Sequence, residues 1–281
     1  MENSGILYVI STPIGNLADM TSRAISILNN VDIIACEDTR SSRSLLNHLD
    51  IKTKCISYHE HSDYKETELI LETLRSGASI ALISDAGTPL ICDPGFKLVR
   101  TVRNLGIDVI PVPGACAVTA ALSVSGLSTD SFLFKGFLPR KKLDRIKILK
   151  DFCDYPFTLI FYESPHRVLK SLKDIELTFG SKRRIFMARE MTKLFETYIL
   201  GSVEDLIDIV ERDTNNQKGE IVLVVEGCEK KSKMLGDAST KILTLLLEEI
   251  SSSKASAIAA KITGENKKML YQEAIRIKRD K

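Results

Sequence analysis

Short apolar runs alternate along most of the chain with longer segments whose apolar side chains recur every three or four residues. The short runs are rich in β-branched residues and predict buried strands, whereas the longer segments have the period of helices that cover a core. We predict helices at 18–29, 41–48, 64–76, 96–105, 117–124 and 168–179, and another one after Ser202. The predicted strands lie at 7–11, 32–36, 55–58, 80–83, 108–112, 157–162, 184–188, 195–200 and 220–225, and one more begins at Phe132.

The N-terminal part repeats a strand followed by a helix about five times, which is typical of βα units. Such units form a mostly parallel sheet with helices on both faces. In open α/β sheets, ligands bind to the loops at the carboxyl ends of the strands. We therefore expect functional residues where the predicted strands end.

The loop after the strand at 80–83 is unusually long and reads SDAGTPLICDPG, residues 84–95. A turn between a strand and a helix usually needs only 2–6 residues. Pro89 and Pro94 stiffen this loop, and Gly87 and Gly95 permit a positive φ or the close approach of a ligand. The pattern favours a ligand-binding loop over an ordinary turn.

Beyond Glu226 the pattern changes. Residues 229–239 have the charged, serine- and glycine-containing composition of a linker, and 240–281 predict three short helices. Helix, glycine turn and basic helix together indicate a small nucleic-acid-binding module, although basic termini are common. The basic face of the last helix consists of Lys267, Lys268, Arg276, Lys278 and Arg279.

Composition and charge narrow the possibilities. The chain is 44% hydrophobic and 27% charged, as globular proteins are, and its net charge of +2 does not by itself imply a polyanionic partner. Residues 254–281 contain eight lysines and arginines against three acids, a net charge of +5, so residues 1–253 carry −3. No segment approaches the ~20 apolar residues of a membrane span, and the N-terminus has no basic region of a signal peptide. We expect a cytoplasmic protein without membrane partners.

The six cysteines are scattered without a C-x-x-C pair. This spacing argues against a zinc knuckle and a disulfide framework, and we expect most of them to be small buried hydrophobic residues. His59 and His61 lie two residues apart but have no third ligand at a suitable spacing. We therefore predict no metal site and consider a polar or substrate-contacting loop there more plausible.

Charged side chains follow several predicted strands. Glu37 and Asp38 follow the strand at 32–36, Glu163 and His166 follow the strand at 157–162, and Glu190 follows the strand at 184–188. These five are candidate acids or bases. Three of them also have a structural alternative. Asp38, like Thr39, can cap the next helix, and Glu163 and Glu190 can pair with Arg167 and Arg189.

A cluster of basic residues follows the strand that begins at Phe132. Its members are Arg140, Lys141, Lys142, Arg145 and Lys147. They predict either a patch that faces phosphates or merely the solvated face of a helix.

Seven segments, in order along the chain, resemble one family. They are VISTPIGNL (9–17), ACEDTR (35–40), SDAGTPLICDPG (84–95), VPGACAVTAALSVSGL (112–127), FYESPHR (161–167), AREMTKLFET (188–197) and KGEIVLVVEG (218–227). The set resembles the ribose 2′-O-methyltransferase I branch, specific for cytidine in small-subunit rRNA, of the tetrapyrrole-methylase superfamily. Tetrapyrrole enzymes of the superfamily carry a glycine-rich first loop, whereas this chain has Thr12-Pro13-Ile14-Gly15 there.

The resemblance implies an α/β fold of two domains, residues 1–113 and 114–228, with S-adenosylmethionine (SAM) bound in the cleft between them. A linker at 229–239 and a basic helical module at 240–281 would follow, and homodimers are usual in the superfamily. The implied cofactor contacts are Pro13, Gly15, Ser84, Asp85, Gly87, Thr88, Pro89, Gly114, Ala115, Cys116, Tyr162, Glu163, Ala188, Arg189, Glu220 and Val222.

The implied reaction moves the methyl group of SAM to a ribose 2′-hydroxyl of 16S rRNA in the small ribosomal subunit. Methyl transfer requires no metal, but a base helps because a neutral hydroxyl is a poor nucleophile. The five candidate acids and bases remain open at this point. We expect RNA contacts from Arg40, Arg140, Lys141, Lys142 and the basic face of the last helix.

Two other functions remain possible. The chain could be a tetrapyrrole C-methyltransferase of the same superfamily, although its first loop lacks the glycines. It could also be a non-catalytic RNA-binding protein that uses residues 240–281, in which case it would not bind SAM.

Overall fold

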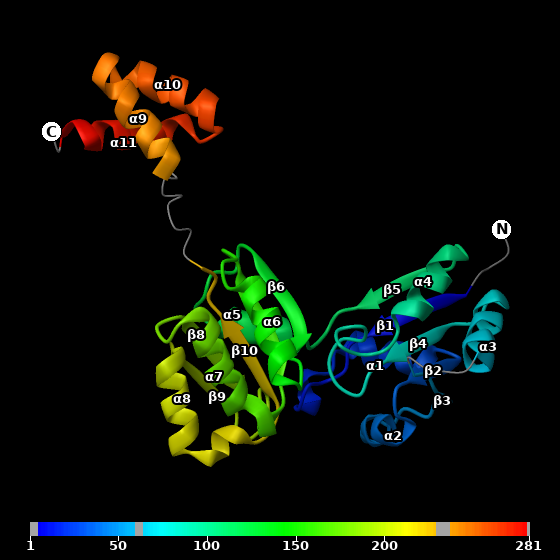
Figure 1. Cartoon of the computed structure of the whole chain (residues 1–281). Helices are drawn as coiled ribbons and strands as arrows, with labels where there is room; N and C mark the ends of the chain where they lie inside the picture. Colours follow the sequence, from blue (N-terminus) through cyan, green and yellow to red (C-terminus); the bar gives the residue numbers. More distant parts are fainter. Residues whose placement is uncertain (1–4, 60–63, 229–236, 280–281) are drawn as a thin grey trace. The chain divides into compact units, whose positions relative to one another are not determined.

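The computed structural model describes residues 5–59, 64–228 and 237–279 (Figure 1). These residues divide into two compact units, Met1–Gly227 and Cys228–Lys281. Two features of the sequence lie partly outside the described residues: His61, and residues 229–236 of the predicted linker.

The first sheet of the larger unit is entirely parallel, with the strand order β3-β2-β4-β1-β5. Apolar side chains of the central strands belong to two separate core clusters, so both faces of the sheet are covered. The prediction of parallel βα units is confirmed. The strands are β1 (Ile6–Ile10), β2 (Ile33–Cys36), β3 (Cys55–Ser57), β4 (Ile80–Ile83) and β5 (Asp108–Val112), and the helices are α1 (Ser22–Asn30), α2 (Thr39–His48), α3 (Tyr64–Arg75) and α4 (Phe96–Asn104).

The second sheet is mixed and has the order β6-β7-β10-β8-β9. Only β6 and β7 are parallel, and the other neighbours are antiparallel. Alternate side chains point to opposite faces, so Phe161 of β7 joins one core and the adjacent Ile160 joins another. The strands are β6 (Phe132–Phe137), β7 (Thr158–Glu163), β8 (Arg184–Arg189), β9 (Thr197–Ser202) and β10 (Ile221–Val225), and the helices are α5 (Ala117–Val124), α6 (Lys142–Phe152), α7 (Val168–Phe179) and α8 (Val203–Arg212).

Polar side chains fix where two of the helices begin. Asp38 accepts a hydrogen bond from the backbone N–H of Arg40 at the start of α2. Ser202 and Asp205 form a reciprocal capping box at the start of α8. Such caps satisfy backbone donors that have no partner within the helix.

The smaller unit contains three helices, α9 (Asp237–Glu249), α10 (Ser252–Thr263) and α11 (Lys267–Arg279). They enclose a small core made of Leu243, Ala255, Ala259, Leu270 and Ala274. Gly264, in the left-handed conformation, ends α10 and allows the chain to turn into α11. The predicted fold class, α/β with two sheets and a C-terminal helical region, is confirmed, whereas the exact domain limits stay a prediction. Within the described ranges, no helix is long and apolar enough to cross a membrane.

Candidate functional site

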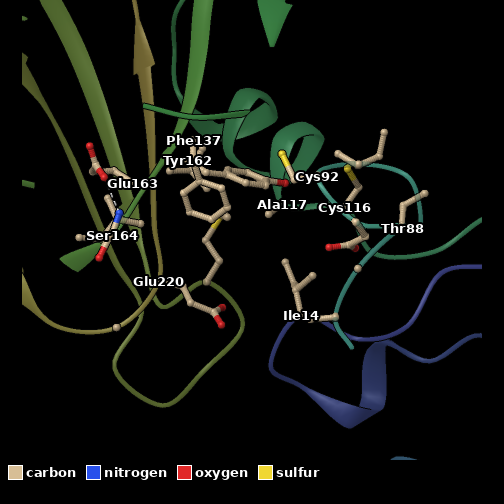
Figure 2. Close-up of a pocket in the computed structure, with 18 of the residues that line it drawn as sticks. Ile14, Thr88, Cys92, Cys116, Ala117, Phe137, Tyr162, Glu163, Ser164 and Glu220 are labelled. Atoms are coloured by element: carbon tan, nitrogen blue, oxygen red, sulfur yellow. Dashed lines mark hydrogen bonds between the residues drawn. The ribbon is translucent and has the colours of Figure 1, made fainter. Parts of the chain in front are cut away.

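A pocket of about 400 Å³ in the larger unit is lined by segments from both sheets (Figure 2). The loop after β4, the start of α5, the end of β7, the loop after β8 and the start of β10 all contribute to it. Its lining consists of Ile14, Ala86, Gly87, Thr88, Ile91, Cys92, Asp93, Cys116, Ala117, Phe137, Tyr162, Glu163, Ser164, Pro165, Met191, Gly219, Glu220, Ile221 and Val222.

Hydrogen bonds fix the long loop after β4 against its neighbours. The backbones of Thr12 and Gly87 exchange two hydrogen bonds, of 2.8 and 3.1 Å. The Thr88 hydroxyl donates to the carbonyl of Ala115 at 3.0 Å and lies 2.8 Å from the Ser11 hydroxyl. The predicted ligand-binding loop is thus tied to the loop after β1 and to the turn before α5, where it forms one wall of the pocket.

Two residues of this loop adopt a backbone conformation that is unusual for their type. Leu90 has φ 73° and Cys92 has φ 71°. Non-glycine residues with positive φ store strain, and such residues cluster at functional sites. This stretch of the loop presents Cys92 and Asp93 to the pocket.

Tyr162 forms part of the opposite wall. Its ring lies between those of Phe134 and Phe137, with edge-to-face contacts at centroid distances of 4.8 and 5.5 Å. Burial raises the pKa of its hydroxyl.

Glu163 is a fully buried carboxylate whose oxygens all have partners. One oxygen accepts from the Arg167 guanidinium at 2.7 Å and from the backbone N–H of Ser164 at 2.6 Å. The other accepts from the Ser171 hydroxyl. The alternative in which Glu163 pairs with Arg167 is therefore correct, and the carboxylate is part of the pocket's framework.

Glu190 lies in the loop after β8, where it accepts hydrogen bonds from Lys193 at 2.8 Å and from the backbone of Glu220 at 2.9 Å. The Lys193 hydrogen bond is the main reason that its pKa is lowered. The alternative in which Glu190 pairs with Arg189 is wrong, because Arg189 donates to the carbonyl of Phe195 and the hydroxyl of Thr197.

Four acids, Glu37, Asp38, Asp85 and Asp93, lie directly after β2 or in the loop after β4. Burial, followed by repulsion from Asp93 and Asp85, raises the pKa of Glu37. Burial also raises the pKa of Asp93, with a smaller contribution from Asp85 and an opposing hydrogen bond from Ser84. Asp38 differs from them, because its hydrogen bonds with the Arg40 side chain and backbone lower its pKa. Of these acids, only Asp93 lines the pocket.

The structure brings seven of the sixteen expected cofactor residues to the pocket. These are Gly87, Thr88, Cys116, Tyr162, Glu163, Glu220 and Val222. The remaining nine do not line it, and their contact with a cofactor stays a prediction: Pro13, Gly15, Ser84, Asp85, Pro89, Gly114, Ala115, Ala188 and Arg189.

Several lining residues were not predicted from the sequence. Asp93 lies in the loop identified as ligand-binding and follows the same reasoning as Asp85, so its signal was present. Met191 and Phe137 carry no signal of this kind, because only the tertiary arrangement turns them towards the pocket. His166, a candidate base, is exposed and does not line the pocket.

The candidate RNA contacts are exposed, whereas one member of the basic cluster after β6 is not. Arg40, Arg140, Lys141, Lys142 and the basic face of α11 all lie at the surface. Arg145, in contrast, is 3% exposed, so both interpretations that placed it in a solvent-facing basic cluster are wrong. Its guanidinium binds Asp174 at 2.6 Å, because a buried charge needs a buried partner.

The cysteines also depart from the prediction, since only Cys36 is buried. Cys92 is exposed and, with Cys116, lines the pocket. Among the described residues, no group of three or more histidine, cysteine, aspartate or glutamate side chains could hold a metal ion.

Two family models match the chain. Tetrapyrrole (Corrin/Porphyrin) Methylases matches residues 6–207, and the RsmI C-terminal HTH domain matches residues 235–278. Proteins named Ribosomal RNA small subunit methyltransferase I are similar over nearly their full length. The one from Pseudomonas aeruginosa is 47% identical over 97% of this chain and 98% of its own length, and the one from Escherichia coli O157:H7 is 47% identical over 98% and 96%.

Solved structures share the fold at much lower identity. A cobalt precorrin-4 methyltransferase is 16% identical, with a TM-score of 0.57 over 78% of this chain and 94% of its own. A diphthine synthase is 13% identical, with a TM-score of 0.58 over 79% and 90%. At these identities the likeness concerns the fold alone.

Proposed function

The chain belongs to the tetrapyrrole (corrin/porphyrin) methylase family, and on this premise we propose that it methylates small-subunit ribosomal RNA with SAM. The proposed acceptor is the ribose 2′-hydroxyl of a cytidine in 16S rRNA. The observation that carries the proposal is the likeness to the rRNA methyltransferases, at 47% identity from end to end.

The pocket suits a cofactor of this kind. Its volume lies within the ~300–1,000 Å³ typical of small-molecule sites, and its lining is mostly apolar. Thr88 and the backbone around Gly87 and Cys116 offer hydrogen-bonding groups, and Asp93 supplies negative charge for a cationic ligand. When bound, SAM supplies an electrophilic methyl group on a sulfonium.

The protein's own part is to position the acceptor, exclude water and remove a proton. Orientation of the reactants can contribute about 7–11 kcal/mol. Glu163 and Glu190 are engaged in ion pairs, and Asp38 caps a helix. Asp93 has no cation partner among the described residues and faces the pocket, so we assign it the role of the base, with Glu37 behind it.

A tetrapyrrole acceptor is the second candidate, because the solved neighbours include a cobalt precorrin-4 methyltransferase. Those likenesses, at 13–21% identity, support the fold and not the substrate. The rRNA acceptor is favoured by the matched RsmI C-terminal HTH domain and by the exposed basic face of α11.

We also propose a homodimer and a cytoplasmic location. Support for the dimer comes from large apolar side chains exposed along β9 and the loop before it: Leu194, Phe195, Tyr198 and Leu200, with 44–88% exposure. Exposed apolar surface of this kind marks interaction sites. The cytoplasm follows from the proposed substrate, since ribosomal RNA is found there.

The test is methyl transfer from labelled SAM to small ribosomal subunits that lack the modification, followed by mapping of ribose methyl groups. We expect one 2′-O-methylcytidine in 16S rRNA. Transfer to a tetrapyrrole and not to RNA would contradict the proposal. If SAM binding is absent by calorimetry, the chain is a non-catalytic RNA-binding protein.

A further inference from the structure

Phe137, the last residue of β6, exposes an aromatic ring at the pocket. It is 58% exposed and nevertheless lines the cavity (Figure 2). A large apolar side chain at a ligand site gains from staying exposed only if something covers it later. Phe132 at the other end of β6 is similarly exposed, at 46%, but does not line the pocket.

A β-bulge aims the Phe137 ring. Phe134 pairs with Ile160 and Phe137 with Tyr162, so three steps on β6 span two on β7. In a regular strand, residues three apart face opposite sides, yet both phenylalanines contact Tyr162. Gly136 makes the bulge possible, because its φ is 70° and a Cβ there would lie 3.0 Å from the Cys92 sulfur.

Two arginine side chains hydrogen-bond to the backbone of the segment after Phe137. Arg167 donates to the carbonyl of Leu138 at 3.3 Å, and Arg145 donates to those of Pro139 and Arg140 at 2.9 and 3.3 Å. The Arg145 guanidinium is itself paired with the carboxylate of Asp174, and that of Arg167 with the carboxylate of Glu163. The backbone is therefore fixed.

The side chains of this anchored segment, by contrast, reach into solvent. Arg140 and Lys141 are exposed, and neither has an acidic partner within the described part of the chain. Lys142 is also exposed, and its ammonium lies 3.9 Å from Asp174. A rigid backbone thus presents two uncompensated cations directly after an exposed aromatic ring.

We propose that Phe137 is the platform on which the RNA nucleotide to be methylated stacks its base, while Arg140 and Lys141 contact the phosphates beside it. This inference rests on the proposed function. An enzyme that modifies a nucleotide takes it out of the base stack, and an aromatic side chain replaces the lost stacking. Adjacent cations then bind the backbone of the same strand.

The adenine of the cofactor is the other base that could stack on Phe137. A small ligand is typically buried over 70–90% of its surface, whereas Phe137 is 58% exposed. The cations beyond the ring fit a polyanionic strand that continues outside the pocket, and a single cofactor offers no such continuation. The RNA base is therefore the better occupant.

The experiment compares Phe137→Ala and Phe137→Trp with the matched control Phe132→Ala. For each protein, SAM affinity is measured by calorimetry, and the half-saturating concentration of unmodified small ribosomal subunits is measured by methyl transfer. We expect Phe137→Ala to raise that concentration about tenfold or more, as the loss of one base–aromatic stack does. SAM affinity should stay within about twofold, and the Phe137→Trp and control variants should behave like the wild type.

Three results would overturn the inference. They are unchanged subunit saturation in Phe137→Ala, an equal loss of SAM affinity, and a Phe137→Trp variant as impaired as the alanine variant. A loss of SAM affinity would assign the ring to the adenine.

Failure of the proposed function itself would look different, because even the wild type would then transfer no methyl group to ribosomal RNA. In that case tryptophan fluorescence tests whether Phe137 stacks on a base, since the chain contains no tryptophan of its own. A short cytidine oligoribonucleotide should quench the emission of Phe137→Trp more strongly than that of Phe132→Trp. Equal quenching in the two variants would contradict the proposal that a base stacks on Phe137.

Discussion

At the scale of single residues, the acids at the pocket have two different roles. Some are paired and stabilise the structure, whereas one has no cation partner among the described residues and can act as a base. Both oxygens of Glu163 and one oxygen of Glu190 accept hydrogen bonds from arginine, lysine, serine or backbone donors. Asp93 is partly buried beside other carboxylates, which raises its pKa. A base works best when its pKa is close to the working pH, and crowding of carboxylates moves an aspartate in that direction.

The raised pKa of Asp93 has a consequence for stability. A carboxyl whose pKa is higher in the folded than in the unfolded state stabilises the fold below its unfolded pKa, and this contribution is lost as the pH rises through the folded pKa. Asp93→Asn should therefore raise the melting temperature at pH 7.5, on the order of a few degrees, and the difference should vanish below about pH 4. The same substitution should lower the rate of methyl transfer about 10²–10⁴-fold.

Asp130→Asn, at an exposed position, is the control for both measurements. A variant at Asp93 that melts lower than the wild type at pH 7.5 would show that the carboxylate stabilises the fold. The base assignment fails if the rate of transfer remains normal.

At the scale of elements, a buried ion pair joins α6 to α7. The Arg145 and Asp174 side chains are 4% and 5% exposed, and Arg145 also holds the backbone of the loop before α6. Removal of one partner leaves the other charge buried and unpaired, which typically costs ~3–5 kcal/mol.

Arg145→Ala should therefore lower the free energy of unfolding by about 3–5 kcal/mol in urea denaturation. Lys147→Ala, at an exposed position of the same helix, should change it by less than about 0.5 kcal/mol. Replacement of both partners by apolar residues, Arg145→Met with Asp174→Leu, should cost less than either single truncation. A single variant as stable as the control would contradict the role of the pair.

The same elements show how far the sequence predicts the structure. Strands such as 108–112 and helices such as 168–179 form where predicted, because apolar periodicity reports which face of an element is buried. The burial of Arg145 could not be predicted, since it depends on Asp174, which lies 29 residues away in the sequence. The antiparallel pairing of β10 and the bulge at Gly136 likewise depend on partners remote in sequence.

The residues of the pocket were also predicted only in part. The motif residues Gly87, Thr88 and Tyr162 reach the pocket, since loops at the carboxyl ends of strands point to a common edge. Asp85 is exposed, does not line the pocket, and accepts a hydrogen bond from the backbone of Asp38 at 3.3 Å. Its neighbour in the loop, Asp93, lines the pocket, because the conformation of a twelve-residue loop is not determined by residue type alone.

At the scale of the whole molecule, charge and chemistry reside in different units. Residues 254–281 carry a net charge of +5, whereas residues 1–253, which include the pocket, carry −3. The five basic residues of α11 are exposed around a small core. Apart from local cations such as Arg140 and Lys141, the net charge of the larger unit does not favour a polyanion, so we assign the attachment of RNA mainly to the smaller one.

A chain that ends at Cys228 should keep its SAM affinity, since the residues that line the pocket all precede that point. It should lose most of its binding to small ribosomal subunits and most of its methylation of them, and the salt dependence of binding should become weaker. Calorimetry, subunit binding at several salt concentrations and methyl transfer measure the three effects.

The opposing result is a shortened chain that methylates normally but melts earlier or changes its oligomeric state. The three helices would then serve packing or assembly. A full-length variant in which Lys267, Lys268, Arg276, Lys278 and Arg279 are replaced by glutamine is the matched control, because it keeps the helices and removes only charge.

The strand order of the first sheet matters while the protein is being synthesised. β1 is the first strand to leave the ribosome, yet its neighbours are β4 and β5, and Leu7 pairs with Ile80 and Val109. At ~5–20 residues per second, about 4–15 s pass between the synthesis of Leu7 and that of Ile80. The adjacent pair β2–β3 is complete well before then. Translation thus delivers one edge of the sheet before its middle, and the nascent chain must keep β1 from false partners until β4 and β5 emerge.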